Sequence, residues 1–329
     1  MKMTSEAKPP YEAVALPTPY PVGRVNAYLL PESSPSLIDA GVRSERSLAE
    51  LEARMDARGL KLEAIDTVLV THLHNDHAGA APEIARRASA PIRCHEESLV
   101  DEERGRAAFL ELIARYGAPP RTTEELRQAW ALSDQFGEPL TGAAEVEILA
   151  DGEHLRAGDV ELEALHTPGH APGHLCFLAR ELGALFCGDL LLEQITSNPL
   201  PHFDESEPRG RRVSLALYLD SLARIESLGP LLGLPGHGAV LADTAAAARR
   251  AAGHINARNK KVLKIMRSFP GANLFELAGK FFFQEQHVLG QTLAFCELLA
   301  HADLLEVRGQ IEVDDSCGVP HITKDDRVG

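Results

Sequence analysis

The stretch that decides the fold is Thr71-His72-Leu73-His74-Asn75-Asp76-His77. It follows an apolar run, residues 65–71, that is typical of a buried β-strand. Histidine and aspartate are standard ligands for metal ions such as zinc, and here four of them lie within six residues. If the chain leaves the strand extended, the first two histidines project to the same side and can share one ion. Asp76 and His77 then fall on the next turn, where they can reach a second ion.

Three more candidate ligands follow predicted strands, each next to a glycine. His170 lies in Thr167-Pro-Gly-His-Ala-Pro-Gly-His174, Asp189 ends Cys187-Gly-Asp, and His237 lies in Leu234-Pro-Gly-His-Gly238. Glycine lets the backbone approach a site closely. Because strand ends in an α/β protein converge on one edge of the sheet, we expect these side chains to join the first four in one site.

These four motifs, in this order and spacing over residues 20–240, resemble the metallo-β-lactamase superfamily. The resemblance implies an α/β fold, the αββα sandwich, with a two-metal site at one edge. It implies that one ion is bound by His72, His74 and His170, and the other by Asp76, His77 and His237, with Asp189 bridging the two. The implied cofactors are two divalent metal ions, zinc foremost, with iron or manganese as alternatives.

The mechanism that we expect follows from two such ions, which together lower the pKa of a shared water to near neutrality. The bridging hydroxide would attack a carbonyl carbon. Asp76, which would orient the hydroxide, and Asp189, which would hold both ions, are the predicted catalytic residues. We predict a metallo-hydrolase of thioesters of the glutathione or coenzyme A type, and hydrolysis of lactones stays open.

Two other activities use the same ligands. A two-metal ribonuclease would cleave phosphodiesters, but the formal net charge of -15 disfavours binding to nucleic acid. A mononuclear iron dioxygenase acting on glutathione persulfide would leave His77 and His237 idle. A non-catalytic scaffold is disfavoured because no ligand of the set is missing.

The domain organisation is indicated by a change of charge. Acidic residues are absent between Asp243 and Glu276, where arginines and lysines gather. Helical patterns then continue to about residue 302, and a small hairpin is expected from residues 304–307 and 310–313 around Gly309. We therefore predict a catalytic domain over residues 1–245, with a helical insertion at 97–140. A winged-helix-like domain over 246–329 would follow, similar to the segment appended in one branch of the superfamily.

Four residues are candidates for substrate contact. His202 lies in a proline-rich stretch, 195–207, that would form a wall of the pocket. Lys260, Lys261 and Lys264 lie on the basic helix predicted at 249–267, which would bind the anionic tail of a substrate. A simple solvated face and an RNA-binding face are the alternatives for this helix.

Composition limits the remaining choices. The chain has 329 residues, of which 44% are hydrophobic and 25% charged, as in ordinary globular domains. Its five cysteines lack CxxC spacing, which favours free thiols in a reducing compartment. No run of about 20 apolar residues and no signal-peptide core occur in the sequence. We expect a cytoplasmic enzyme that acts on a small, anionic molecule without a membrane partner, and homo-oligomerisation is compatible with the sequence.

Overall fold

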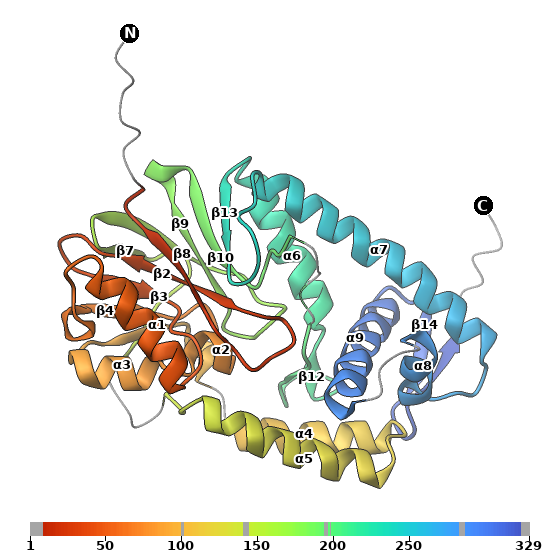
Figure 1. Cartoon of the computed structure of the whole chain (residues 1–329). Helices are drawn as coiled ribbons and strands as arrows, with labels where there is room; N and C mark the ends of the chain where they lie inside the picture. The colour runs from red at the N-terminus through yellow and green to blue at the C-terminus, as the bar shows by residue number, and fades with distance from the viewer. Residues whose placement is uncertain are drawn as a thin grey trace.

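Two β-sheets stacked face to face form the larger part of the molecule (Figure 1). The computed structural model describes residues 9–99, 102–140, 145–193, 197, 199–282 and 287–323. The first sheet has the strand order β1-β2-β3-β4-β5-β6, antiparallel from β1 to β3 and parallel from β3 to β6. Its strands are β1 (Glu12–Leu16), β2 (Val25–Leu30), β3 (Ser36–Ile38), β4 (Thr67–Leu69), β5 (Ile92–Cys94) and β6 (Val146–Ile148).

The second sheet has the order β13-β10-β9-β8-β7. Its strands are β7 (His154–Ala157), β8 (Val160–His166), β9 (Leu175–Ala179), β10 (Ala184–Gly188) and β13 (Leu232–Pro235). The pair β10–β13 is parallel, whereas β9 runs antiparallel to both β8 and β10. Strands β8, β10 and β13 therefore point the same way and end at the same edge of the sheet.

Helices cover the outer face of each sheet, which completes the predicted αββα sandwich. Helix α1 (Glu45–Asp56) begins at Ser44, whose side chain accepts a hydrogen bond from the Ser47 amide, and packs with α3 (Ala81–Ala88) on the first sheet. Helix α6 (Ser214–Ser227) and the first half of α7 (Thr244–Ser268) cover the second sheet. A separate apolar cluster, including Tyr28 and Phe186, fills the space between the sheets.

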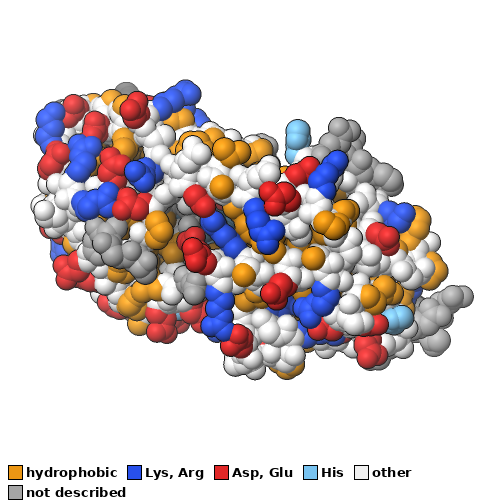
Figure 2. Space-filling view, turned by 90° about the horizontal axis from the view of Figure 1, so that it is seen from below, with side chains coloured by type: hydrophobic (Ala, Val, Ile, Leu, Met, Phe, Trp, Pro, Cys, Tyr) orange, Lys and Arg blue, Asp and Glu red, His pale blue; other side chains and the backbone are white. Residues whose placement is uncertain are grey.

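The insertion at 97–140 and the C-terminal segment pack against each other rather than standing apart. The insertion forms α4 (Glu102–Arg115) and α5 (Pro120–Ser133), which run along the lower side of Figure 1 toward the C-terminal helices. Their apolar faces share one buried cluster with the second half of α7, with α8 (Leu274–Phe281) and with α9 (Val288–Val307). Seen from below, acidic and basic side chains are interspersed over the surface (Figure 2). Between α4 and η3 (Asp134–Phe136), Arg106 pairs with Asp134 at 2.6 Å.

The predicted hairpin around Gly309 is wrong in position. Residues 304–307 continue α9, and the hairpin is formed instead by β14 (Ile311–Asp314) and β15 (Val319–Ile322). Leu304 and Leu305 are buried, so packing favours the helix over a strand, and Gly309, with φ of +65°, ends it. Whether this segment is a winged-helix domain separate from residues 1–245 stays a prediction.

Helix α9 is long and apolar enough to cross a membrane by length and composition. However, 67% of its most apolar window is buried inside the protein, as expected of a helix in a protein core. The remaining short elements are helix α2 (Asn75–Ala78), the hairpin of β11 (His202–Phe203) and β12 (Arg211–Arg212), and the 3-10 turns η1 (Leu62–Ala64), η2 (Glu96–Ser98), η3 (Asp134–Phe136) and η4 (Arg180–Leu182).

Candidate metal centre

All seven predicted metal ligands come together where β4, β8, β10 and β13 end. His72 and His74 follow β4, and Asp76 and His77 lie on α2, the short helix that comes next. The other three leave the second sheet, and they are His170 after β8, Asp189 after β10 and His237 after β13. Two groups of donor atoms result, one from His72, His74 and His170 and one from Asp76, His77 and His237, with the atoms of each group within 4.8 Å of one another. A further combination, His72, His77 and Asp189, meets the same limit and links the two groups.

The first group consists of three ring nitrogens that converge. His74 Nδ1 lies 3.0 Å from His72 Nε2 and 3.0 Å from His170 Nε2. The tautomer of His72 is set on its far side, where Nδ1 lies 3.0 Å from Thr71 Oγ1. Because that hydroxyl donates its proton to Asp39, it accepts one from His72 Nδ1, which leaves the lone pair of Nε2 facing the group.

The two histidines of the second group are also held by hydrogen bonds on their outer ring nitrogens. His77 donates from Nδ1 to Asp39 Oδ2 at 2.8 Å, and His237 donates from Nδ1 to the Arg24 carbonyl at 2.8 Å. Both Nε2 atoms therefore face the centre, where they lie 3.3 Å apart and could bind an ion once deprotonated. Asp76 Oδ2 completes the group, 3.2 Å from His237 Nε2. Such outer hydrogen bonds orient histidine ligands in metal sites generally.

Asp189 lies between the two groups. Its Oδ2 is 3.8 Å from both His170 Nε2 and His237 Nε2, and its Oδ1 is 3.4 Å from His77 Nε2. The buried Oδ1 makes no hydrogen bond with any described residue. Its neighbour His77 Nε2 is too distant for a good hydrogen bond, and a metal ion between the two would be a closer partner for both. The Asp189 amide donates to His174 Nε2 at 3.2 Å, so the backbone of this residue is held in place.

The electrostatics of the two groups also fit divalent cations. Burial, reinforced by the neighbouring imidazoles, holds the pKa of His72 well below its usual value, so this ring stays neutral and can act as a ligand. Burial opposes the charged form of His77, but the carboxylates of Asp189 and Asp39 outweigh it and raise the pKa of His77 well above its usual value. The second group is thus a place where the protein favours positive charge, and a metal ion bound there would replace the proton on His77 Nε2.

Glycines make the close approach of these loops possible. A Cβ on Gly236 would lie 2.5 Å from both Asp189 Oδ1 and His77 Cε1. Gly169, at φ of +137°, packs so tightly on α6 that a Cβ would lie 2.5 Å from the Tyr218 Cα. A larger residue at position 236 would displace a predicted ligand, and one at position 169 would push the loop of His170 away from α6.

Two residues that support the ligands, Asp39 and Thr71, were not predicted from the sequence. Asp39 is 2% exposed and accepts hydrogen bonds from His77 Nδ1 and from the Thr71 amide. The signal for it was a carboxylate at the end of the apolar run Ser36-Leu-Ile-Asp39, directly before Ala40-Gly41. A carboxylate at the end of a buried apolar run is unfavourable unless a buried donor pairs with it.

The predicted substrate residues have different locations. His202 is buried on β11. The His170 backbone and the His74 side chain are among the groups that influence the pKa of its ring, so they lie near it. Lys260, Lys261 and Lys264 are exposed on α7 and are not part of the two donor groups. Their role in binding an anionic substrate stays a prediction.

A third cluster of possible donors, His95, Glu97 and His166, already has protein partners. The two rings stack with centroids 3.7 Å apart, and His166 Nε2 donates to the Pro172 carbonyl at 2.8 Å. Both Glu97 oxygens accept from Arg212 Nη1 at 2.9 Å. We interpret this cluster as structural.

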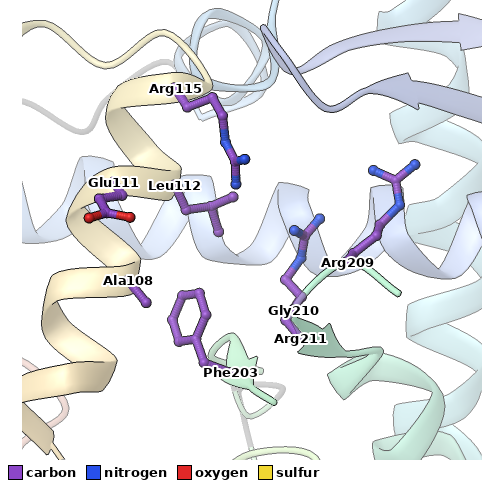
Figure 3. Close-up of a pocket in the computed structure, with 8 residues that line it drawn as sticks. All are labelled: Ala108, Glu111, Leu112, Arg115, Phe203, Arg209, Gly210 and Arg211. Carbon is purple, nitrogen blue, oxygen red and sulfur yellow. The ribbon is translucent and has the colours of Figure 1, made fainter. Parts of the chain in front are cut away.

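A cavity of about 270 Å³ lies between α4 and the β11–β12 hairpin (Figure 3). Phe203, Ala108 and Leu112 provide apolar wall, and three arginines, Arg115, Arg209 and Arg211, point toward it. Each arginine is paired with a carboxylate, namely Asp315, Glu306 and Asp303 respectively. The cavity is therefore not a concentrated positive site, and we do not assign it to the reaction.

Comparison with known proteins places the chain in a family. Residues 20–237 match the model of the metallo-beta-lactamase superfamily. Among curated proteins, the chain is 28% identical to the probable metallo-hydrolase YqjP of Bacillus subtilis, over 91% of this chain and 93% of that one. It is 30% identical to an atrochrysone carboxyl ACP thioesterase of Aspergillus fumigatus, over 66% of this chain and 51% of that protein.

Two solved structures resemble the whole chain, including its C-terminal segment. The metallo-beta-lactamase family protein TTHA1429 of Thermus thermophilus is 27% identical with a TM-score of 0.79, covering 96% of this chain and 99% of that one. A beta-lactamase domain protein of Burkholderia ambifaria is 26% identical with a TM-score of 0.82, covering 97% and 94%. With the predicted sandwich and the His/Asp clusters at its edge, these matches show that the chain belongs to the metallo-β-lactamase superfamily and is a metallo-hydrolase of that superfamily.

Proposed function

We propose that this protein is a dinuclear metal-dependent hydrolase of acyl compounds, and that thioesters are its principal substrates. The observation that carries the proposal is Asp189, whose carboxylate lies against both donor groups. Oδ2 is 3.8 Å from His170 of the first group and 3.8 Å from His237 of the second, and Oδ1 is 3.4 Å from His77 of the second. A mononuclear site would leave the second group, with its buried ring nitrogens and carboxylate, without a role.

Two divalent ions in these groups would supply a water of lowered pKa and a Lewis acid for the carbonyl oxygen of the substrate. The residues of the chain orient the metal-binding histidines and the attacking water. Asp39 and the Arg24 carbonyl keep protons on the outer nitrogens of His77 and His237, so that the inner nitrogens stay free to bind. Burial favours neutral Asp76, but His77 and His237 outweigh it and lower its pKa, so this carboxylate stays ionised and can orient the attacking water.

The thioester preference is supported by a relative. The Aspergillus fumigatus protein that is 30% identical is named a thioesterase, and the matched region spans about half of it. We extend its chemistry to this chain as a proposal, with lactones as the runner-up substrate. Zinc is the metal we expect, because histidine and carboxylate ligands in groups of three suit it well.

The test is thiol release from a panel of small thioesters, including lactoyl-glutathione and several acyl-CoAs, by protein of known metal content. We expect release that a chelator abolishes and that added zinc restores, with two ions per chain in active protein. A matched lactone panel is run in parallel. Release from no thioester by metal-loaded protein would refute the proposed preference, and hydrolysis confined to lactones would replace it.

A further inference from the structure

His202 is a buried histidine whose ring nitrogens have no hydrogen-bond partner of normal geometry among the described residues, and the ring interacts only weakly with the His170 backbone. The residue is 4% exposed, and Nδ1 and Nε2 are both buried. A histidine ring carries at least one N–H donor in either protonation state. A buried polar group without partners is unfavourable, and native proteins retain such groups mainly where another molecule completes them.

The strand that carries His202 is held from two sides. On the neighbouring strand β12, Arg211 makes a bidentate pair with Asp303 of α9, at 2.9 and 2.7 Å. Arg212, which lies opposite His202 in the hairpin, binds Glu97 at 2.9 Å and Asp204 at 2.9 Å. The position of the ring is thus fixed before any substrate arrives, as a precise hydrogen bond to a ligand requires.

The two residues of β11 face opposite ways, because side chains alternate along a strand. Phe203 lines the cavity beside α4 (Figure 3). His202 lies toward the metal centre, since the His170 backbone and the His74 side chain act on its ring. Both of these residues belong to the first donor group.

We propose that His202 is a substrate-contacting residue, whose imidazole donates a hydrogen bond to the carbonyl oxygen of an acyl substrate held at the metal centre. The inference rests on the proposed hydrolase activity and adds a donor that none of the seven metal ligands provides. A donor aimed at an oxygen that gains charge in the transition state accelerates the reaction more than it tightens binding.

The test compares His202→Leu, His202→Gln and His202→Asn with Phe203→Leu, the matched control on the opposite face of the same strand. We expect His202→Leu to lower kcat by about 10²-fold with little change in KM. Its metal content should equal that of the wild type. Its melting temperature should be equal or higher, because an unpartnered polar group is replaced by an apolar one. Phe203→Leu should retain kcat.

The amide variants identify the nitrogen that donates. Gln places an N–H near the position of Nε2 and Asn near that of Nδ1, so one of them should recover part of the lost kcat. Full activity of His202→Leu, or a fall in kcat that is matched by losses of metal or of thermal stability, would overturn the inference. Wild-type protein that hydrolyses no acyl substrate would overturn the proposed function itself, whereas active wild type with an equally active His202→Leu overturns only the role of His202.

Discussion

Asp39 accepts a hydrogen bond from His77 Nδ1 at 2.8 Å across the end of the first sheet. The Thr71 amide, at 2.8 Å from Oδ1, and the Thr71 hydroxyl, at 2.8 Å from Oδ2, hold the carboxylate in place. Asp39 has φ of +59°, in the left-handed region that aspartate and asparagine adopt more readily than other side chains. Because this carboxylate fixes the tautomer of His77, it controls whether the inner nitrogen is free for a metal ion.

Asp39→Asn is therefore expected to weaken metal binding by about 10- to 100-fold. The asparagine keeps the shape and the backbone conformation, but it offers one acceptor oxygen where Thr71 and His77 require two. Metal affinity is measured by competition with a chromogenic chelator. Asp66→Asn, at an exposed position, is the control and should bind metal like the wild type. Equal affinity in the Asp39 variant would show that the carboxylate does not control His77.

Gly236→Ala tests the crowding at the other end of the site. The new Cβ would lie 2.5 Å from Asp189 Oδ1 and from His77 Cε1, so one ligand must move. We expect loss of bound metal and a decrease in hydrolysis of about 10²-fold or more. Gly253→Ala on α7 is the control, because its Cβ would meet open space and alanine favours a helix. Metal content by elemental analysis should fall only in the Gly236 variant, and a full complement there would contradict the geometry.

The meeting of the seven candidate ligands could be predicted from the sequence because each is a histidine or aspartate in a distinctive local pattern. His170, Asp189 and His237 each follow a strand and accompany a glycine, and the convergence of strand ends brings them together. The role of Asp39 was not predicted. Its role depends on the pairing of β3 with β4, and its partner His77 is 38 residues away in sequence.

The C-terminal segment could be predicted less well. Residues 304–307, Leu-Leu-Glu-Val, are apolar enough for a strand or a helix, and periodicity does not decide between them in so short a run. Packing decides, since Leu304 lies against the second-sheet cluster and Leu305 against the insertion helices. No local pattern indicates that α4 and α9, distant along the chain, share one core.

The buried ion pair of Arg211 and Asp303 joins the hairpin of His202 to α9, and their side chains are 2% and 7% exposed. Asp303→Leu should lower the free energy of unfolding by about 3–5 kcal/mol, because it leaves a buried guanidinium without its partner. The double variant Arg211→Met/Asp303→Leu should recover most of that loss, since neither charge remains to be desolvated. Urea unfolding of the metal-loaded proteins measures both. A double variant no more stable than Asp303→Leu would mean that the cost comes from packing rather than from the unpaired charge.

His301 should make folding stability depend on pH. It is 2% exposed, its Nδ1 donates to Asn259 Oδ1 at 2.6 Å, and burial lowers its pKa to about 3. In the unfolded chain the His301 ring is protonated below about pH 6.5, whereas in the folded protein it is protonated only below about pH 3. Between these two pH values the unfolded state therefore binds more protons than the folded state. The contribution of His301 to the free energy of unfolding is therefore complete above pH 6.5 and is lost as the pH falls toward 3.

His301→Gln isolates this contribution, because glutamine can still donate to Asn259 but does not titrate. The variant should be less stable than the wild type at pH 7, and the difference should shrink by roughly 2 kcal/mol between pH 7 and pH 5. Urea unfolding of both proteins at the two values is the measurement. Comparing the two proteins at each pH cancels the loss of metal at low pH, which is common to both. A difference that stays constant with pH would mean that His301 is protonated alike in the folded and unfolded states, against its burial between α7 and α9.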